Sequence, residues 1–291
     1  MHIVSAEPIS CKKGGRNVMK RIKAGTVIKY IFMIILAAMF LVPVIMMLLG
    51  SVKDAGQALQ FDLSWPKSFH FENYSYVFEH GNILRGYMNS FVITVSATVL
   101  TILFGAFAGI VISRRSDKTS KRLYYYFIFG LTMTLQTAST FALLKVLNIY
   151  GTRFAVIAIY IGMRMPFTIM SFSSFVKGIP REIDEAAMID GCRPFTMIVR
   201  VLLPILKPIT VTNIVITAIS CWNDFMVPLF YLGSAQKWTV TLSVYNFFGM
   251  FARNWNYVFA VLTLTVLPII ILFLFLQKYI VSGMTSGAVK G

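Results

Sequence analysis

The chain has 291 residues, of which 57% are hydrophobic and 13% are charged, and its mean hydropathy is +0.73. A soluble domain carries about 25% charged residues, so the composition excludes an ordinary soluble protein and indicates a lipid bilayer as the main solvent. The formal charge of +16 does not indicate nucleic-acid binding, because the basic residues gather in polar segments between apolar ones. The three cysteines lack CxxC spacing, so neither a disulfide framework nor a metal site is expected.

Six apolar stretches recur along the chain, and each is long enough to cross a bilayer as a helix of about 20 residues. They predict an all-α, polytopic membrane protein. The six expected transmembrane helices cover residues 27–50, 87–112, 123–144, 154–176, 209–232 and 257–280.

The basic residues predict how these helices are oriented. If the polar, basic segment 1–26 is a cytoplasmic extension, the cytoplasmic segments hold 19 Lys and Arg and the outer segments hold 7. Basic segments favour the cytoplasmic side, where the lipid surface is anionic. Both termini are therefore expected in the cytoplasm, with a transmembrane domain over 27–281 and a tail over 282–291. No small-residue cleavage signal follows the first apolar run, so the first helix is expected to be retained.

The polar segments between the first three helices differ in composition. The outer segment 51–86 mixes aromatic and acidic residues, which predicts either a small external cap or an ordinary loop. The inner loop 113–122 is short and basic, and is expected to anchor its helices at the lipid headgroups. Gly105 and Gly109 form a GxxxG pattern, which permits close contact between helices.

The cytoplasmic loop 177–208 is the least apolar part of the second half of the chain. Residues 181–192 predict a helix too short to cross a membrane, with acidic residues in its first turns and Gly191 placed to end it in a left-handed turn. One shallow face of this helix holds Ile183, Ala186, Ala187 and Asp190. Such a segment is either an amphipathic connecting loop or a docking surface for another protein.

The stretch EAAMIDGCRPFTMIVRVLLP resembles the EAA motif of bacterial ABC-importer permeases: Glu-Ala-Ala, three residues, Gly, nine residues, then Ile-x-Leu-Pro. The matching residues are Glu185, Ala186, Ala187, Gly191, Val201, Leu203 and Pro204, with Val201 the single departure. The resemblance implies a type I ABC-importer permease fold, in which this coupling helix docks on a cytoplasmic ATPase. It further implies that Glu185 makes a polar contact, that Ala186 and Ala187 form the close-packed surface, and that Asp190, Gly191, Leu203 and Pro204 complete the docking loop.

A second resemblance, to the MalG-type permeases of carbohydrate importers, covers nearly the whole chain after residue 20. It rests on QKYIVSGMTSGAVKG at the C-terminus, on SWPKSFHFENYSYVF in the outer segment, on Asn89-Ser90 and on WNDF. It implies a tail that reaches the ATPase, made flexible by Gly283, Gly287 and Gly291. The chain departs from the family just before Gln136, where relatives have a proline, and this leaves the path of the third helix open.

Together the resemblances imply a permease subunit of a carbohydrate importer in the bacterial cytoplasmic (inner) membrane. The implied partners are a second permease subunit, ATPase subunits that bind ATP and Mg²⁺, an extracytoplasmic solute-binding protein and a sugar. The chain has no Gly-Lys dipeptide and hence no P-loop, and it has no HExxH or GxSxG motif. It is therefore expected not to be catalytic on its own.

Polar residues within the predicted spans, together with one tryptophan, are candidates for the solute path because buried polar groups are costly in lipid. They are Gln136, Arg164, Asn213, Trp222, Asn223 and Asp224. The last three are the first choice for sugar contact, since a sugar needs hydrogen-bonding partners and an aromatic face. Alternatively, Asp224 pairs with an arginine, or these groups bridge helices. In the outer segment 233–256, the candidate contacts for the solute-binding protein are Tyr245, Asn246 and Phe247.

Two other functions remain open. The same machine could carry a non-sugar solute such as a polyamine or a phosphonate. An ion-coupled secondary transporter is a different class, and it predicts paired carboxylates or broken helices at the midplane and inverted repeats. Asp224 is the only acidic residue within a predicted span, which favours the importer.

Overall fold

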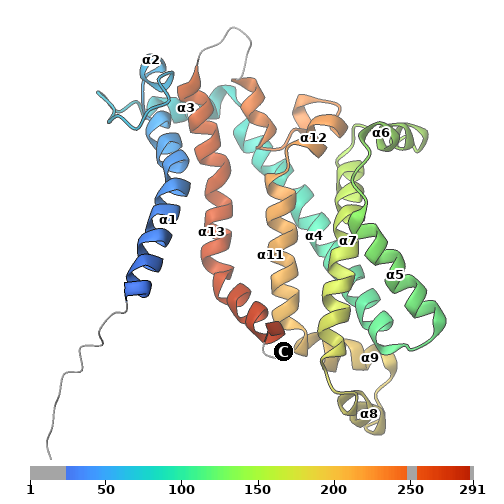
Figure 1. The fold of residues 1–291 in the computed structure, drawn as a ribbon. Coiled ribbons are helices and arrows are strands. Elements are labelled where there is room, and N and C mark those ends of the chain that lie inside the picture. Colours follow the sequence, from blue (N-terminus) through green and yellow to red (C-terminus); the bar gives the residue numbers. More distant parts are fainter. Residues whose placement is uncertain (1–23, 248–253, 289–291) are drawn as a thin grey trace, which may run out of the picture. The chain divides into compact units, whose positions relative to one another are not determined.

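The computed structural model describes residues 24–247 and 254–288, and every regular element within these ranges is a helix (Figure 1). This confirms the all-α class. The chain divides into two units, Met1–Ile45 and Met46–Gly291. Helix α1 (Ala24–Ser51) begins in the first unit and ends in the second, and its apolar sequence agrees with the first predicted span.

Within residues 24–247 and 254–288, four helices are long and apolar enough to cross a membrane: α1, α4 (Ile83–Arg114), α7 (Arg153–Lys177) and the Trp255–Phe275 part of α13 (Trp255–Ala288). Two further helix pairs in the described part of the chain meet the same criteria of length and composition when each bent pair is counted as one span, which gives up to six. One pair is Lys118–Thr132 with Thr137–Val146, in the predicted third span, and the other is Pro194–Ile205 with Lys207–Asn223, bent by 77° just before the predicted fifth span.

The predicted third span consists of two helices, α5 (Lys118–Thr132) and α6 (Thr137–Val146), bent by 117° at residues 133–136. The break occurs without a proline. Tertiary contacts hold it instead: the Tyr231 hydroxyl donates to the Thr137 carbonyl at 3.1 Å, and Leu135 packs on a buried cluster. Neither contact has a local signature in the sequence.

The prediction of one helix over 209–232 is wrong at residues 224–225, because α11 (Lys207–Asn223) ends there and α12 (Met226–Tyr231) begins. The Asp224 carboxylate accepts hydrogen bonds from the backbone N–H groups of Met226 at 2.9 Å and Val227 at 3.3 Å. A carboxylate that satisfies the free N–H groups of a first turn favours a new helix start. Asp224 therefore ends the predicted span.

Helices α4 and α7 pack closely through the GxxxG pattern. A Cβ atom on Gly105 would lie 2.5 Å from Thr168 Cγ2, and one on Gly109 would lie 2.7 Å from Phe172 Cβ. Since real Cβ atoms do not approach so closely, only glycine allows this contact. The pattern thus marks the α4–α7 interface, as its spacing predicted.

The segment between α1 and α4 forms a small folded cap that contains α2 (Ala55–Ala58) and α3 (Glu72–His80). The Lys53 side chain is 1% exposed, and its Nζ lies 2.7 Å from Asp62 Oδ1. Asn73 Nδ2 donates to the Ser51 and Lys53 carbonyls at 2.9 Å and accepts at Oδ1 from Asn256 of α13 at 2.8 Å. The segment 51–86 was expected to be either a cap or an ordinary loop, and these contacts show that it is folded as a cap.

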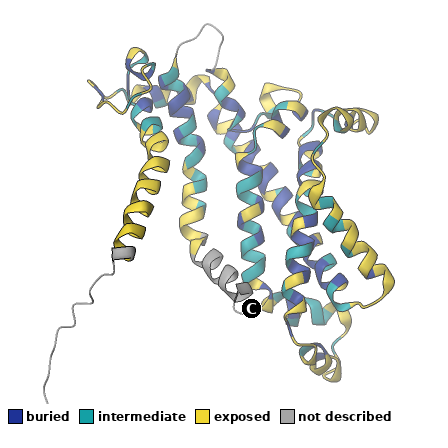
Figure 2. Cartoon of the chain, viewed as in Figure 1, coloured by how far each residue is buried: buried dark blue, intermediate teal, exposed yellow. Residues whose placement is uncertain are grey.

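Helices α5 and α6 are largely exposed, as Figure 2 shows, and each buries a single residue, Ser120 and Leu144 respectively. Their exposed side chains include many large apolar ones, which lipid or another membrane helix can cover. The remaining short elements are α8 (Glu182–Ile189), α9 (Pro194–Met197), a π-helical turn (Ile198–Leu202), α10 (Leu203–Ile205) and 3₁₀ turns at Ala235–Lys237 and Leu242–Asn246.

Candidate docking helix and solute path

Helix α8 projects at one end of the second unit, next to α9, while α6 and α12 lie at the opposite end (Figure 1). We call these the α8 end and the α12 end. The helix begins at Glu182, one residue later than predicted, and acidic residues occupy its first turn. Negative charge there is favoured by the positive end of the helix dipole.

Gly191 ends this helix in a left-handed conformation, with φ of +78°. Its N–H donates to the Met188 carbonyl, and the N–H of Cys192 donates to the Ala187 carbonyl, both at 3.0 Å. This pair of bonds is the Schellman motif, which satisfies the last carbonyls of a helix. The turn predicted for Gly191 is confirmed.

A nearly buried ion pair fixes α8 to the end of α4. Arg114 Nε lies 2.6 Å from Asp184 Oδ2, and Arg114 Nη2 donates to Asp184 Oδ1 at 3.2 Å. The same guanidinium donates through Nη1 to the Ile179 carbonyl at 3.0 Å. The two side chains are only 14% and 11% exposed, so this contact is weakly screened by solvent.

A hydrophobic cluster supports the remainder of the predicted coupling loop (177–208). Residues of α4 and α7 in the cluster pack against Leu202 and Leu206, which are both fully buried. The Phe195 ring stacks on Phe107 of α4 with 6.0 Å between centroids. The loop therefore moves with α4 and α7 unless this packing is broken.

The exposed face of α8 differs in part from the predicted one. Glu185, Ala186 and Asp190 are exposed, but Ala187 is buried against the rest of the chain, because its position faces inward with Asp184. Pro204 is exposed and Leu203 is partly buried.

Two apolar residues of α8 that were not among the predicted docking residues, Met188 and Ile189, are 57% and 86% exposed. An apolar pair at the tip of a projecting helix is costly in water and favours a contact. They occupy two of the three positions that the EAA motif leaves unspecified between Ala187 and Gly191, so the motif gave no signal for them.

Among the predicted path residues, Arg164 and Asp224 lie near the same two side chains. Tyr160 and Cys221 belong to one buried cluster, and Arg164 of α7 and Asp224 at the α11–α12 break are both within electrostatic range of them. No direct ion pair joins Arg164 to Asp224 in the part of the chain that the structure describes. Gln136 is exposed, and it lies at the break between α5 and α6.

Trp222 lies in the core of the fold, which favours helix bridging over the predicted contact with a sugar. The side chain is 8% exposed in a core cluster, and its indole N–H donates to the Thr265 carbonyl of α13 at 3.1 Å. Asn213 likewise bridges helices, since its Nδ2 donates to Ser171 Oγ of α7 at 2.9 Å. Asn223, the last residue of α11, is exposed. Helix bridging therefore accounts for two of the six candidates.

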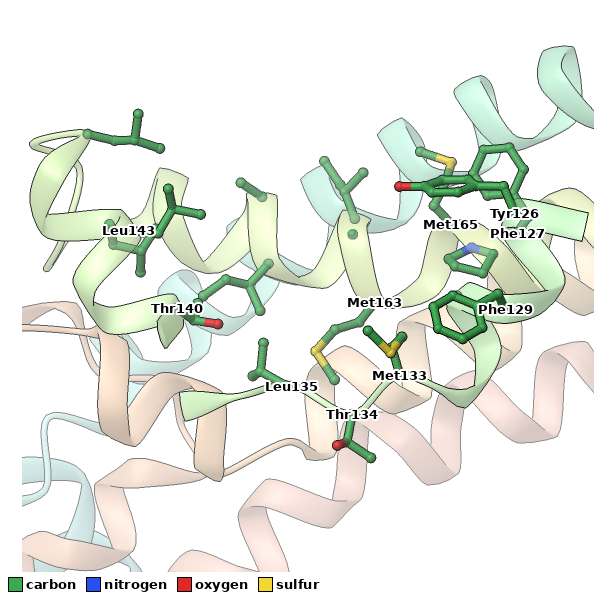
Figure 3. Close-up of a pocket in the computed structure, with 18 of the residues that line it drawn as sticks. Tyr126, Phe127, Phe129, Met133, Thr134, Leu135, Thr140, Leu143, Met163 and Met165 are labelled. Carbon is green, nitrogen blue, oxygen red and sulfur yellow. The ribbon is translucent and has the colours of Figure 1, made fainter. Parts of the chain in front are cut away.

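A cavity of about 1010 Å³ lies between α5, α6 and α7 (Figure 3). None of the predicted path residues lines it. Its lining is mainly apolar and includes Tyr126, Met133, Leu135, Met163 and Met165. Such a surface offers few hydrogen-bonding partners to a sugar and is suited to apolar contact.

The three outer candidates are separated by the fold. Tyr245 is exposed and its ring stacks on Phe225 with 5.4 Å between centroids, and Asn246 is exposed with its Nδ2 donating to the Gly81 carbonyl at 3.0 Å. Phe247 is buried at 7% exposure against Tyr257. It is therefore not accessible to a partner, unlike the expectation.

The tail expected to be flexible from residue 282 is helical for most of its length. Helix α13 continues to Ala288, so the backbones of Gly283 and Gly287 are helical, and Gly291 lies outside the described residues.

The chain is similar to known transport proteins along nearly all of its length. A family model described as "Binding-protein-dependent transport system inner membrane component" matches residues 101–286. The probable ABC transporter permease protein YurM of Bacillus subtilis (strain 168) is 32% identical over 264 residues, covering 90% of this chain and 87% of that protein. The melibiose/raffinose/stachyose import permease protein MelC of the same organism is 32% identical over 276 residues, covering 93% and 99%.

Among solved structures, a bacterial ABC transporter involved in the import of the acidic polysaccharide alginate matches with a TM-score of 0.79, covering 89% of this chain and 98% of that chain. The identity is 19%, so this likeness shows the fold alone. The family model covers more than half of the chain, and the fold supplies several membrane-spanning helices. The chain therefore belongs to the family of binding-protein-dependent transport system inner membrane components and is a multi-pass membrane protein.

Proposed function

We propose that this permease subunit carries a sugar or an oligosaccharide into the cell as part of an ATP-driven ABC importer, and that α8 is the helix that docks on the ATPase. The observation that carries the proposal is the geometry of α8. The helix projects from the bundle with Glu185, Met188 and Ile189 exposed, yet Asp184 anchors it to α4.

The substrate class rests on relatives. One relative is a melibiose/raffinose/stachyose import permease, another is an arabinooligosaccharide transport permease, and a third belongs to a multiple sugar-binding transport system. Their matches cover at least 90% of this chain. A shared sugar class is therefore the simplest account.

Motion of α8 would be transmitted through two connections. The Asp184–Arg114 ion pair joins it to α4, and the cluster under Leu202 and Leu206 joins the coupling loop to α4 and α7. In this account, closure of an ATPase dimer that binds ATP and Mg²⁺ moves α8. The attached helices then tilt and open the path to the other side of the membrane. Such a cycle needs only a difference in affinity between two states.

Two other partners and the location complete the proposal. The exposed apolar faces of α5 and α6 and the cavity beside them suit a second permease subunit. The α12 end, with exposed Tyr245 and Asn246, is proposed to meet an extracytoplasmic solute-binding protein. The α8 end and both termini then face the cytoplasm of a bacterium, and the protein resides in its cytoplasmic (inner) membrane.

The decisive experiment is reconstitution of the chain with and without its ATPase subunits in vesicles, with uptake of labelled oligosaccharide as the readout. Uptake is expected only with the ATPase and ATP. Uptake by the permease subunits alone would contradict docking and point to an ion-coupled carrier. ATP-dependent transport of a non-sugar solute, with no sugar uptake, would contradict the substrate class only.

A charge reversal tests the docking helix directly. Glu185→Arg is expected to abolish co-purification of the ATPase while the chain still inserts in the membrane. The control is Glu79→Arg, an equal change at an exposed residue of α3 away from α8. Equal ATPase recovery with both variants would overturn the assignment of α8.

A further inference from the structure

A second cavity, with a polar lining, lies at the α8 end, apart from the predicted path residues and from the exposed face of α8. Its volume is about 560 Å³, and it is lined where α4 ends, α5 begins and α7 ends, with one residue from the start of α8. Four of the lining residues are cationic: Arg115, Lys121, Lys177 and Arg181. No acidic residue is among those that line it.

The positive charge of this cavity is not neutralised within the fold. Across residues 24–247 and 254–288, no carboxylate forms an ion pair with Lys121, Lys177 or Arg181. Arg115 alone has one, with Asp117 at 3.2 Å. The Asp117 carboxylate also accepts the Ser120 N–H at 3.1 Å, which starts α5. Three cations therefore share one cavity without a counter-charge.

Helix dipoles account for only two of these four cations. Lys177 lies in the last turn of α7 and Arg115 is the C-cap of α4, where positive charge is favoured. Lys121 follows the first three residues of α5, and Arg181 is the N-cap of α8, so both stand where the dipole disfavours positive charge. Cations held at unfavourable helix ends around a common cavity indicate an anionic ligand.

The neutral groups of the cavity fit the same ligand. Ser113 is among the residues that line the cavity, and its Oγ is buried without a hydrogen-bond partner among the described residues. Arg181 Nη2 reaches Ser116 Oγ at 3.4 Å, and Lys177 Nζ lies 4.2 Å from the centre of the Tyr124 ring. Tyrosines at the ends of spans are typical of headgroup depth. Guanidinium, ammonium and hydroxyl donors together match the oxygens of a phosphate.

We propose that this cavity binds a phosphate group, supplied either by an anionic phospholipid headgroup or by a soluble phosphate compound. The bound phosphate bridges α4, α5 and α7 and contacts α8 through Arg181. The site is thus more specific than general attraction of the basic loop 113–122 to lipid headgroups. It does not depend on which solute is carried.

The test uses the full chain in its purified transporter complex, titrated separately with phosphatidylglycerol, phosphatidylcholine and inorganic phosphate. Binding is followed by native mass spectrometry for the lipids and by calorimetry for phosphate. The test variant is Lys121→Gln with Arg181→Gln. The matched control is Lys118→Gln with Arg122→Gln, which removes the same charge from exposed positions of α5 that do not line the cavity.

Loss of one hydrogen bond to a bound charged group weakens binding about tenfold, so the test variant is expected to bind about 100-fold more weakly, whereas the control, whose side chains do not reach the cavity, loses only general surface attraction and is expected to bind at most about tenfold more weakly. If this loss appears with phosphatidylglycerol, the source is the lipid. If it appears only with inorganic phosphate, the source is soluble, and the site stands in either case. An equal change in the two double variants, or no change in either, overturns the proposal.

A second variant covers the case in which the double variant does not assemble. Ser116→Asp adds a carboxylate beside Arg181 in an exposed loop, without removing any cation. It is expected to lower anion binding at least fivefold. Wild-type affinity in Ser116→Asp, for both phosphatidylglycerol and inorganic phosphate, also overturns the site.

Discussion

Asp184 and Arg114, which are 70 positions apart in the chain, form a two-pronged and nearly buried contact that ties α8 to the end of α4. Removing one partner of such a pair leaves a charge without compensation in a poorly solvated place, and this costs about 3 kcal/mol. Asp184→Asn is therefore expected to destabilise the α8 end by about that amount. Solute-stimulated ATP hydrolysis should fall, with the ATPase still bound.

Arg122 of α5 provides the control, because its side chain is exposed and forms no ion pair within the described part of the chain. Arg122→Gln is expected to change stability by less than about 0.5 kcal/mol. Exchange of the pair, with Asp at 114 and Arg at 184, should restore part of the lost stimulation. The restoration is partial because the bond from Arg114 to Ile179 is lost. Equal stimulation in Asp184→Asn and Arg122→Gln would show that the ion pair has no role in coupling.

Gly191 offers a prediction about conformation alone. A Cβ at this position meets nothing within 4 Å, but the φ of +78° is strained for other residues. Gly191→Ala is expected to cost about 1–2 kcal/mol and to speed hydrogen exchange in residues 182–192. Gly191→Asn should behave nearly as wild type, since asparagine tolerates this conformation. If hydrogen exchange in residues 182–192 is equally fast in Gly191→Ala and Gly191→Asn, the left-handed turn does not determine the stability of α8.

The predicted coupling loop shows which structural features can be predicted from the sequence and which cannot. The helix and its turn were predictable because acidic residues, an EAA pattern and a glycine are local signals. The inward position of Ala187 was not, because it follows from the contact of Asp184 with Arg114, 70 residues away. A helical period indicates which residues share a face, but only the neighbouring helices decide which face is covered.

The predicted path residues show the same difference between features set by local sequence and features set by tertiary contacts. Hydropathy located the spans, but the breaks at 133–136 and at Asp224 depend on Tyr231 and on a side-chain cap. Trp222 was expected to meet a sugar because of its type. Its partner, the Thr265 carbonyl, lies on another helix and assigns it to the core instead.

The α4–α7 contact predicts a steric cost at Gly109. A Cβ there would lie 2.7 Å from Phe172 Cβ and 2.9 Å from the Ile169 carbonyl oxygen, and backbone cannot yield easily. Gly109→Ala is expected to lower the free energy of unfolding by about 1–3 kcal/mol. Gly162→Ala in α7 is the control, because its Cβ meets nothing within 4 Å and alanine favours a helix. Thermal unfolding in detergent, compared between the two, measures the difference, and equal melting temperatures would contradict the close packing.

The cap between α1 and α4 is expected to loosen in acid. Hydrogen bonds from the buried Lys53 ammonium and then from Ser64 lower the pKa of Asp62 below its usual value of 3.8. A carboxyl whose pKa is lower in the folded state contributes stability that is complete above the unfolded value, near pH 4, and is lost as pH falls through the folded value. Proteolysis between residues 52 and 80 should therefore accelerate below about pH 4 in wild type. In Asp62→Asn, proteolysis of this segment should be faster than in wild type at neutral pH, and its rate should change less between pH 5 and pH 3. Parallel profiles for the two proteins would show that another group controls the cap.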